Sequence, residues 1–360
     1  MTIARAISRL CLLTLALLLV PGGASAQGYG GLAPEREDGY ARVSRDTPIT
    51  FPEDHGAHPR FRNEWWYVTA NLEGEDGETY GAQWTLFRTA LRPGEDPGSW
   101  ASNQLWFAHA ALTGAGFHAH AEKFSRGGIG TAGVLAAGDA EGGLDAWIDD
   151  WSLAGPSPAR VAMRAGGEGF AYDLALSTTR PFVRQGDNGF SLKTPTGQAS
   201  HYYAQPFFEV SGHIEHGGQR IAVTGRAWMD REWSSQILTD AQEGWDWFAF
   251  HLDETTKLMV GRMRNTDGTS FILGNWATGD GRSVEIAGSA VTLEPTRWTA
   301  IDDREVPTSW RLSIPSRGVE IETEPLNPRA WMGTAFAYWE GPIRFTGSHE
   351  GVGYLEMTGY

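Results

Sequence analysis

One aromatic-led segment occurs twice in this chain, and the repeat constrains the fold more than any other feature. In the first copy a polar run ends at Glu64 and is followed at once by Trp-Trp-Tyr-Val-Thr, residues that suit a pleated, half-buried strand. The second copy is the segment GWDWFAFHLDETTKLMVG. The repeat predicts two copies of one β unit, each a small barrel able to hold an apolar ligand. Three positions keep their spacing over 180 residues: Trp65, Leu72 and Gly81 recur as Trp245, Leu252 and Gly261.

The rest of the chain consists of short runs in which apolar and polar residues alternate, separated by Gly, Asp, Asn and Pro. Strands at this spacing are typical of antiparallel sandwiches and barrels. The clearest runs are residues 79–91, 103–114, 169–179 and 219–230. Apart from one candidate short helix, residues 234–242, no amphipathic run is long enough for a helix. We therefore predict an all-β chain.

The last strands of the two halves are also similar. We expect an extended arm over residues 27–50, a first barrel over 51–233 and a second over 234–360, with 234–244 as the linker. Chance matches also occur in β-rich sequences, so an unduplicated fold stays open. In the match, Tyr202-Tyr203 with Val210-Ser211-Gly212 aligns with Tyr338-Trp339 and Phe345-Thr346-Gly347, and Trp228-Met229-Asp230 aligns with Tyr354-Leu355-Glu356.

The first 26 residues have the pattern of a cleaved export signal. Arg5 and Arg9 form a basic region, residues 10–20 are apolar, and Ala24-Ser25-Ala26 is a small-residue cleavage site. The apolar run is too short to cross a bilayer as a helix, which needs about 20 residues. We expect a periplasmic or secreted protein; a retained N-terminal anchor is the alternative.

Composition excludes several classes of site. Cys11, inside the leader, is the only cysteine, so disulfides, thiolate metal sites and a thiol nucleophile are excluded from the mature chain. Removing Arg5 and Arg9 leaves 27 of 29 basic residues against 44 acidic ones, a formal charge of −17. An acidic surface disfavours nucleic acid and anionic lipid as partners. The 16 Trp residues indicate wide apolar interiors or stacking surfaces.

Several segments together resemble the AttH family, which is also called the carotenoid 1,2-hydratase (CrtC) family. The resemblance covers nearly all of residues 50–360. It implies two tandem lipocalin-like (calycin) antiparallel β-barrels, with apolar ligand space between or within them. Members include hydratases, relatives that cyclise polyenes, and exported proteins linked to transporter operons. The segments are DHGAHPRFRNEWWYVT, ASHYYAQPFFEVSG, GRAWMDREW, GWDWFAFHLDE, YWEGPIRFTG and GYLEMTGY.

The resemblance also implies a catalytic set. In the hydratases an H-x-W pair lies 27 residues before a Y-x-D pair, a spacing that falls here on His201, Tyr203, Trp228 and Asp230, with the two aromatic types exchanged. An Asp facing an apolar cavity stays protonated and can act as the acid. Trp228 would stabilise a developing cation, His201 would accept a proton from the attacking water, and Tyr203 would orient that water.

The alternative for Asp230 is structural: an ion pair with Arg226 or Arg231 that closes the barrel. In lipocalins a Trp near the start of the first strand packs across the closed end of the barrel. By resemblance we expect Trp65 to do this in the first half, and Trp245 and Trp247 in the second.

A cluster of Asp54, His55, His58 and Glu64 could suggest a metal site, but its spacing fits no zinc-hydrolase motif. We interpret it as a polar plug over the barrel mouth that bonds Arg60 or Arg62. No P-loop, dinucleotide fingerprint or hydrolase motif is found, so we expect neither cofactor nor metal.

Two functions fit these features. The favoured one is an exported, monomeric protein that binds an apolar isoprenoid- or lipid-like ligand and is linked to an ABC-type exporter. The alternative is an enzyme resembling carotenoid 1,2-hydratase, which adds water to, or rearranges, a polyene double bond by Asp-centred acid catalysis.

Overall fold

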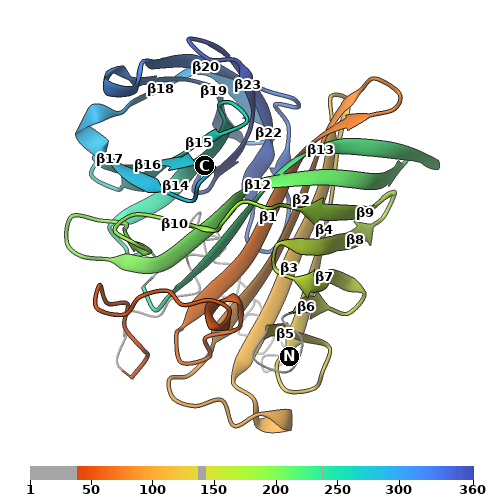
Figure 1. Ribbon diagram of the computed structural model, residues 1–360, viewed down its shortest axis with the longest axis vertical. Helices are drawn as coiled ribbons and strands as arrows, with labels where there is room; N and C mark the ends of the chain where they lie inside the picture. The colour runs from red at the N-terminus through yellow and green to blue at the C-terminus, as the bar shows by residue number, and fades with distance from the viewer. Residues whose placement is uncertain (1–38, 137–142, 237) are drawn as a thin grey trace, which may run out of the picture.

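The structure, a computed structural model, describes residues 39–136, 143–236 and 238–360 (Figure 1). The predicted leader and the first half of the predicted arm, residues 27–38, lie outside the described residues. From residue 39 the arm packs on the first sheet: the Tyr40 hydroxyl donates to the Ala90 carbonyl at 2.9 Å, and Ile49 is buried. The helical turns in the described part are short 3-10 turns: η2 (Glu53–His55), η3 (Ser99–Ala101), η4 (Gly288–Ala290) and η5 (Pro315–Arg317). Among the described residues, no helix is long and apolar enough to cross a membrane.

Thirteen strands form the first sheet, in the order β4-β3-β2-β1-β13-β12-β9-β8-β7-β6-β5, with β10 and β11 paired to β12. Neighbouring strands are antiparallel. The strands are β1 (Asn63–Gly74), β2 (Thr79–Ala90), β3 (Gln104–Gly114), β4 (Phe117–Arg126), β5 (Ala132–Ala136), β6 (Leu144–Ile148), β7 (Trp151–Ser157), β8 (Arg160–Gly167), β9 (Phe170–Ser177), β10 (Val183–Arg184), β11 (Phe190–Leu192), β12 (Ala199–His216) and β13 (Gln219–Ser234).

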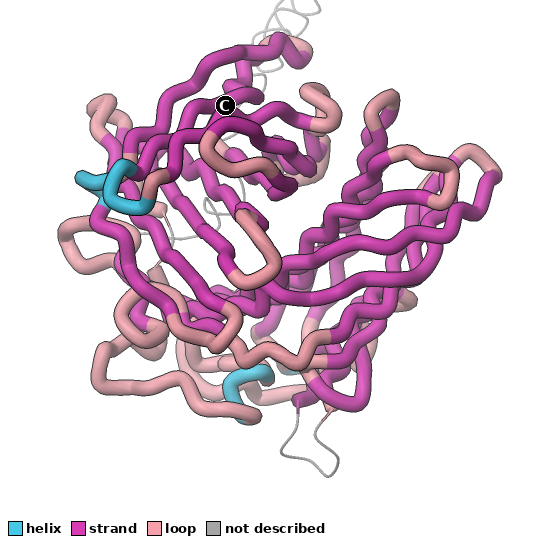
Figure 2. Tube along the Cα trace, turned by 45° about the horizontal axis from the view of Figure 1, so that its top comes forward, coloured by secondary structure: helices cyan, strands magenta, loops and turns pink. Residues whose placement is uncertain are grey.

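Ten strands form the second sheet, in the order β17-β16-β15-β14-β23-β22-β20-β19-β18, with β21 paired to β22. Both sheets curl strongly (Figure 2). The strands are β14 (Gln242–His251), β15 (Thr256–Asn265), β16 (Ser270–Thr278), β17 (Ser283–Ala287), β18 (Thr292–Ile301), β19 (Arg304–Ile314), β20 (Val319–Pro325), β21 (Trp331–Met332), β22 (Tyr338–Gly347) and β23 (Gly351–Met357).

The two sheets repeat one arrangement. β1, which carries Trp65, lies between β2 and β13, and β14, which carries Trp245, lies between β15 and β23. The first strand of each half therefore pairs with both the second strand and the last one. The all-β prediction of two Trp-led units is confirmed. The candidate helix over residues 234–242 is wrong: its described residues are the end of β13, a loop and the start of β14.

The concave side of each sheet is filled with apolar side chains. In the first half Trp66, Val68, Ala70 and Leu72 of β1 belong to the core, because side chains alternate between the two faces of a strand. The prediction that Trp65 packs across the closed end of the barrel is therefore wrong, since it is the next residue, Trp66, that faces the barrel interior.

In the second half, too, the residues that face the core are the neighbours of those predicted. Phe248 and Phe250 of β14 lie in the core with Trp310. The predicted closed-end positions of Trp245 and Trp247 are therefore wrong, because both line a pocket on the opposite face of this strand.

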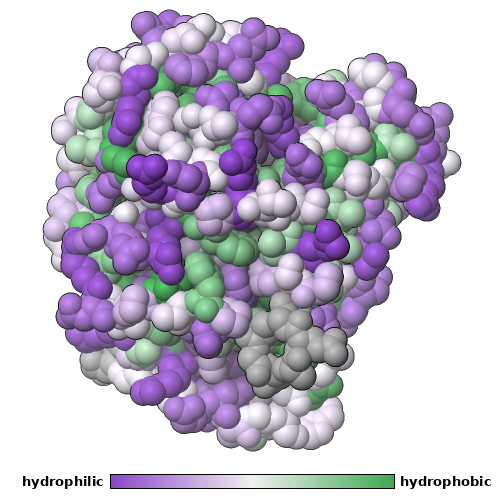
Figure 3. Space-filling view, viewed as in Figure 1, coloured by the Kyte–Doolittle hydropathy of each residue, from purple (hydrophilic) through white to green (hydrophobic). Residues whose placement is uncertain are grey.

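The outer faces of the two sheets pack against each other. The Tyr67 hydroxyl donates to Glu340 at 2.9 Å, and the Asn71 amide donates to the Gly353 carbonyl at 2.8 Å. Gly81, one of the repeated residues, is needed for this close approach, since a Cβ there would lie 2.5 Å from a ring carbon of Pro342. The solvent-exposed face seen in Figure 3 is mostly hydrophilic, as a formal net charge of −15 leads one to expect.

Candidate functional site

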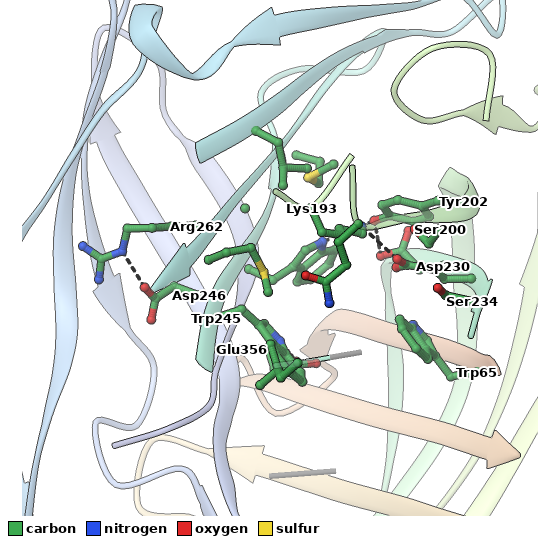
Figure 4. A pocket seen from close by; sticks show the side chains of 18 of the residues that line it. Trp65, Lys193, Ser200, Tyr202, Asp230, Ser234, Trp245, Asp246, Arg262 and Glu356 are labelled. Carbon is green, nitrogen blue, oxygen red and sulfur yellow. Dashed lines mark hydrogen bonds and ion pairs between the residues drawn. The ribbon is translucent and has the colours of Figure 1, made fainter. Parts of the chain in front are cut away.

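A pocket of about 100 Å³ lies between the outer faces of the two sheets (Figure 4). β1, β12 and β13 supply one wall, and β14, β15, β16 and β23 supply the other. Apolar and ionisable side chains share this lining. The apolar ones include Trp65, Trp245, Trp247, Met259 and Leu273, and the ionisable ones include Lys193, Asp230, Glu232, Asp246, Arg262 and Glu356.

Asp230 is the most strongly enclosed acid of the first wall. It is buried, and its two carboxyl oxygens accept hydrogen bonds of 2.7 Å from the Tyr202 hydroxyl and from Nε1 of Trp228. Burial raises the pKa of Asp230 well above its usual range, and the nearby Glu232 adds to the rise, although both hydrogen bonds oppose it. A protonated carboxyl can still accept hydrogen bonds, so Asp230 can be neutral in this setting.

Glu356 is the matching acid of the second wall. Burial, helped by the charge of Glu232, raises the pKa of Glu356 to about 7. A hydrogen bond of 2.5 Å from Nε1 of Trp245 partly opposes this rise. Glu340 lies directly opposite Glu356 on β22, and burial together with this neighbour raises the pKa of Glu340 well above its usual range. The interface thus holds three buried carboxyls whose pKa values are raised above their usual range.

Two ion pairs flank these acids. Lys193 pairs with Glu232 at 2.8 Å, and its ammonium lies 4.8 Å from the centre of the Tyr202 ring. Asp246, at the other side of the pocket, accepts from Nε of Arg262 at 2.6 Å and from the Tyr360 hydroxyl at 2.8 Å. The charged groups are therefore paired beside the pocket, whereas Asp230 contacts uncharged donors.

The structure brings together only part of the predicted catalytic set. Asp230 and Trp228 lie on the face of β13 that meets the second barrel. Asp230 pairs across the strands with Ala204, so the β12 residues on its face are those with even numbers, Tyr202 among them. The predicted grouping of His201 and Tyr203 with Asp230 is wrong, because both point to the other face.

His201 and Tyr203 belong to an aromatic cluster at the end of the first barrel. The Tyr203 hydroxyl lies 2.7 Å from Nδ1 of His55, and Tyr203 lies in the first core. His201 packs against Trp233 at a ring-centre distance of 5.3 Å, and burial lowers its pKa to about 4. Neither residue lines the pocket between the barrels.

Three of the four residues predicted to form a polar plug, Asp54, His58 and Glu64, contact one another, with other arginines than expected. Glu64 is fully buried and contacts the guanidinium groups of Arg88 and Arg231, where Arg60 or Arg62 was predicted. Burial alone would raise the pKa of Glu64, but the two guanidiniums outweigh burial and hold it well below its usual range.

His58 ties this ion cluster to the loop that precedes β1. Its two ring nitrogens lie 3.0 Å from Asp54 and 3.1 Å from Glu64. In the part of the chain that the structure describes, no group of three or more His, Cys, Asp or Glu side chains is arranged to hold a metal ion.

Sequence reasoning missed Tyr202 and Glu356 as pocket residues. A signal for Glu356 was present, since Tyr354-Leu355-Glu356 aligns with Trp228-Met229-Asp230 in the repeat. No sequence signal marked Lys193 or Glu232, which reach the pocket from a loop after β11 and from β13.

Known proteins share this architecture. The model of the AttH-like family matches residues 42–360. The crystal structure of a candidate AttH protein from Nitrosomonas europaea is 34% identical over 89% of this chain and 99% of its own, with a TM-score of 0.79. No curated protein sequence matches the chain.

Two more distant structures share the fold alone. Kievitone hydratase from Nectria haematococca is 12% identical over 89% of this chain and 96% of its own, with a TM-score of 0.63. CghA, solved with Sch210972, is 10% identical over 92% of this chain and 97% of its own, with a TM-score of 0.55.

Proposed function

The chain belongs to the AttH-like family, and we propose that it binds a small, mainly apolar molecule of isoprenoid or lipid type in the pocket between its two barrels. One observation carries the proposal: Asp230 and Glu356, one from each barrel, are buried carboxyls of raised pKa that line a single aromatic-walled pocket. Apolar walls with a few convergent polar groups are typical of small-molecule sites.

The size of the pocket limits what it can hold. Its volume of about 100 Å³ is below the roughly 150 Å³ of an apolar cavity that accepts benzene. It therefore suits one end of a branched apolar chain, and a longer ligand would extend beyond it. Neutral carboxyls suit a ligand that carries a hydroxyl or carbonyl, since each can donate one hydrogen bond.

A second candidate function is acid-catalysed hydration, which the burial of Asp230 and its two uncharged hydrogen-bond donors favour. The Asp230 carboxyl would give its proton to an alkene carbon, water would add to the resulting cation, and the carboxylate would regain a proton from the added water. The Trp65 ring at the pocket could stabilise the cation through its π face. Hydration is also the reaction in the name of kievitone hydratase.

Export belongs to the same proposal. The leader pattern of residues 1–26 supports a periplasmic or secreted protein. We further propose that the protein is monomeric and works with an ABC-type exporter. The mass of the protein recovered from the periplasm or medium tests export: a chain that starts at Gln27 supports it, and an intact leader contradicts it.

Titration with geraniol, a short isoprenoid alcohol, tests binding through quenching of tryptophan fluorescence. We expect saturable quenching in the wild type and affinity at least about tenfold lower in Trp65→Ala, because the variant removes an aromatic wall. Trp100→Ala is the control, since Trp100 is 72% exposed and lies outside the pocket. Equal affinity in all three proteins would contradict the site. Product analysis of the wild-type mixture then separates binding from hydration.

A further inference from the structure

A second and larger hollow lies between the barrels, near the turn that joins β14 to β15. Its volume is about 630 Å³, and polar side chains dominate its lining. Basic groups outnumber acidic ones there, although the formal net charge of the whole chain is −15. The charged lining residues are Arg160, Arg180, Arg226 and Lys257 against Glu209 and Glu254.

Two of the lining groups are buried cross-strand neighbours. His251 on β14 pairs with Lys257 on β15, and each is only 3% exposed. Nδ1 of His251 has no hydrogen-bond partner among the described residues, an expensive arrangement for a buried polar atom. A ligand in the hollow could supply that partner.

Lys257 is short of acceptors as well. An ammonium has three N–H donors, and the hydrogen bond described for this one runs to the Asp253 carbonyl at 2.6 Å. Burial, and then the charge of Arg226, lower the pKa of Lys257 to about 8. Burial lowers the pKa of His251 well below its usual range, and the charges of Lys257 and Arg226 lower it further. The basic groups thus destabilise one another.

The acid that pairs with Arg226 compensates these charges poorly. Arg226 pairs with Glu254, whose side chain is 81% exposed, and exposed ion pairs contribute little. An anion held between Arg226 and Lys257 would interact with both cations in a less solvated setting.

We propose that this hollow is an anion site that binds the carboxylate or phosphate group of a small molecule, held by Lys257, Arg226 and Arg180, with His251 as a further hydrogen-bond partner. Guanidinium and ammonium groups are the usual partners of both oxyanions. The site is separate from the apolar pocket: the Trp228 ring lies 6.2 Å from that of His251 on one side and bonds Asp230 on the other.

Calorimetric titration of the full chain with inorganic phosphate, and separately with acetate, tests the proposal. We expect the wild type to bind at least one of the two anions, and the relative affinities to show which oxyanion chemistry the site prefers. Lys257→Met and Arg226→Gln should each weaken binding about tenfold or more. Arg311→Gln is the control, because Arg311 is an exposed arginine paired with Glu322, outside the hollow.

His251→Phe tests the hydrogen-bond partner while keeping a ring of similar size, and it should weaken binding severalfold. Geraniol affinity should be unchanged in Lys257→Met, so failure of the anion site and failure of the apolar pocket can be told apart. The proposal is overturned if neither anion binds the wild type, or if the control weakens binding as much as Lys257→Met does. Thermal unfolding of each variant identifies a loss of binding that comes from misfolding.

Discussion

Asp230 and Glu356 occupy equivalent positions in the two barrels and face the same pocket. Asp230 lies opposite Tyr67 on β1, and Glu356 lies opposite Trp247 on β14, in the pairing of the last strand of each half with its first strand. Because the two barrels pack by these faces, the equivalent carboxyls of both barrels lie in one pocket, where neither is fully solvated.

Glu356→Gln should change how stability depends on pH. The folded pKa of about 7 lies above the usual value of 4.5, so the wild type is more stable below pH 4.5 and loses that contribution as the pH rises toward 7. The loss is on the order of a few kcal/mol. Urea unfolding across this range should show the slope in the wild type, and a smaller slope in Glu356→Gln. Equal slopes would count against a neutral Glu356.

Glu64→Gln should be strongly destabilising, by about 3 kcal/mol or more, because it leaves Arg88 and Arg231 buried without a counter-charge. Since the pKa of Glu64 is lowered, its contribution is present above pH 4.5 and is lost as the pH falls through the folded value. Urea unfolding at neutral pH measures the effect. The matched control is Glu322→Gln at an exposed pair, which should change stability by less than about 1 kcal/mol.

His201→Phe should leave geraniol binding intact, because His201 faces the end of the first barrel and not the pocket. Fluorescence titration beside Trp65→Ala makes the comparison. If His201→Phe weakened binding as much as Trp65→Ala, a ligand site inside the first barrel would be the better account.

Tyr202→Phe should raise the pKa of Asp230 further. The hydroxyl bond of 2.7 Å favours the charged carboxylate, so its removal favours the neutral form while the ring stays in place. The pH titration of the Asp230 carboxyl carbon by NMR, with Asp230→Asn to assign the signal, gives the value in each protein. A lower pKa in Tyr202→Phe would contradict this geometry.

The fold could be predicted because the repeat and the alternating strands are local properties of the sequence. Which of the two alternating sets of side chains faces the barrel interior could not be predicted. Residues of β1 are buried on both faces, since one face lines the barrel and the other meets the second barrel. Trp65 and Trp66 are then equally plausible core residues, and only the packing of the two sheets distinguishes them.

The same limit applies to β12, whose first ten residues are all buried. His201 and Tyr203 share a face with each other, as predicted, but nothing in the local pattern placed Tyr202 rather than Tyr203 beside Asp230. The burial and raised pKa of Asp230 were predictable from the apolar residues before it, while its partners depended on register.

Burial raises the pKa of Asp230 well above its usual range, and we expect this carboxyl to face the ligand pocket in its neutral form. The most direct measurement is the infrared difference spectrum of the wild type minus Asp230→Asn, recorded at neutral pH with and without geraniol. We expect a protonated-carboxyl C=O band that is present in the wild type, absent in the variant, and shifted by the ligand. A difference spectrum that contains only carboxylate bands, unchanged by the ligand, would contradict it.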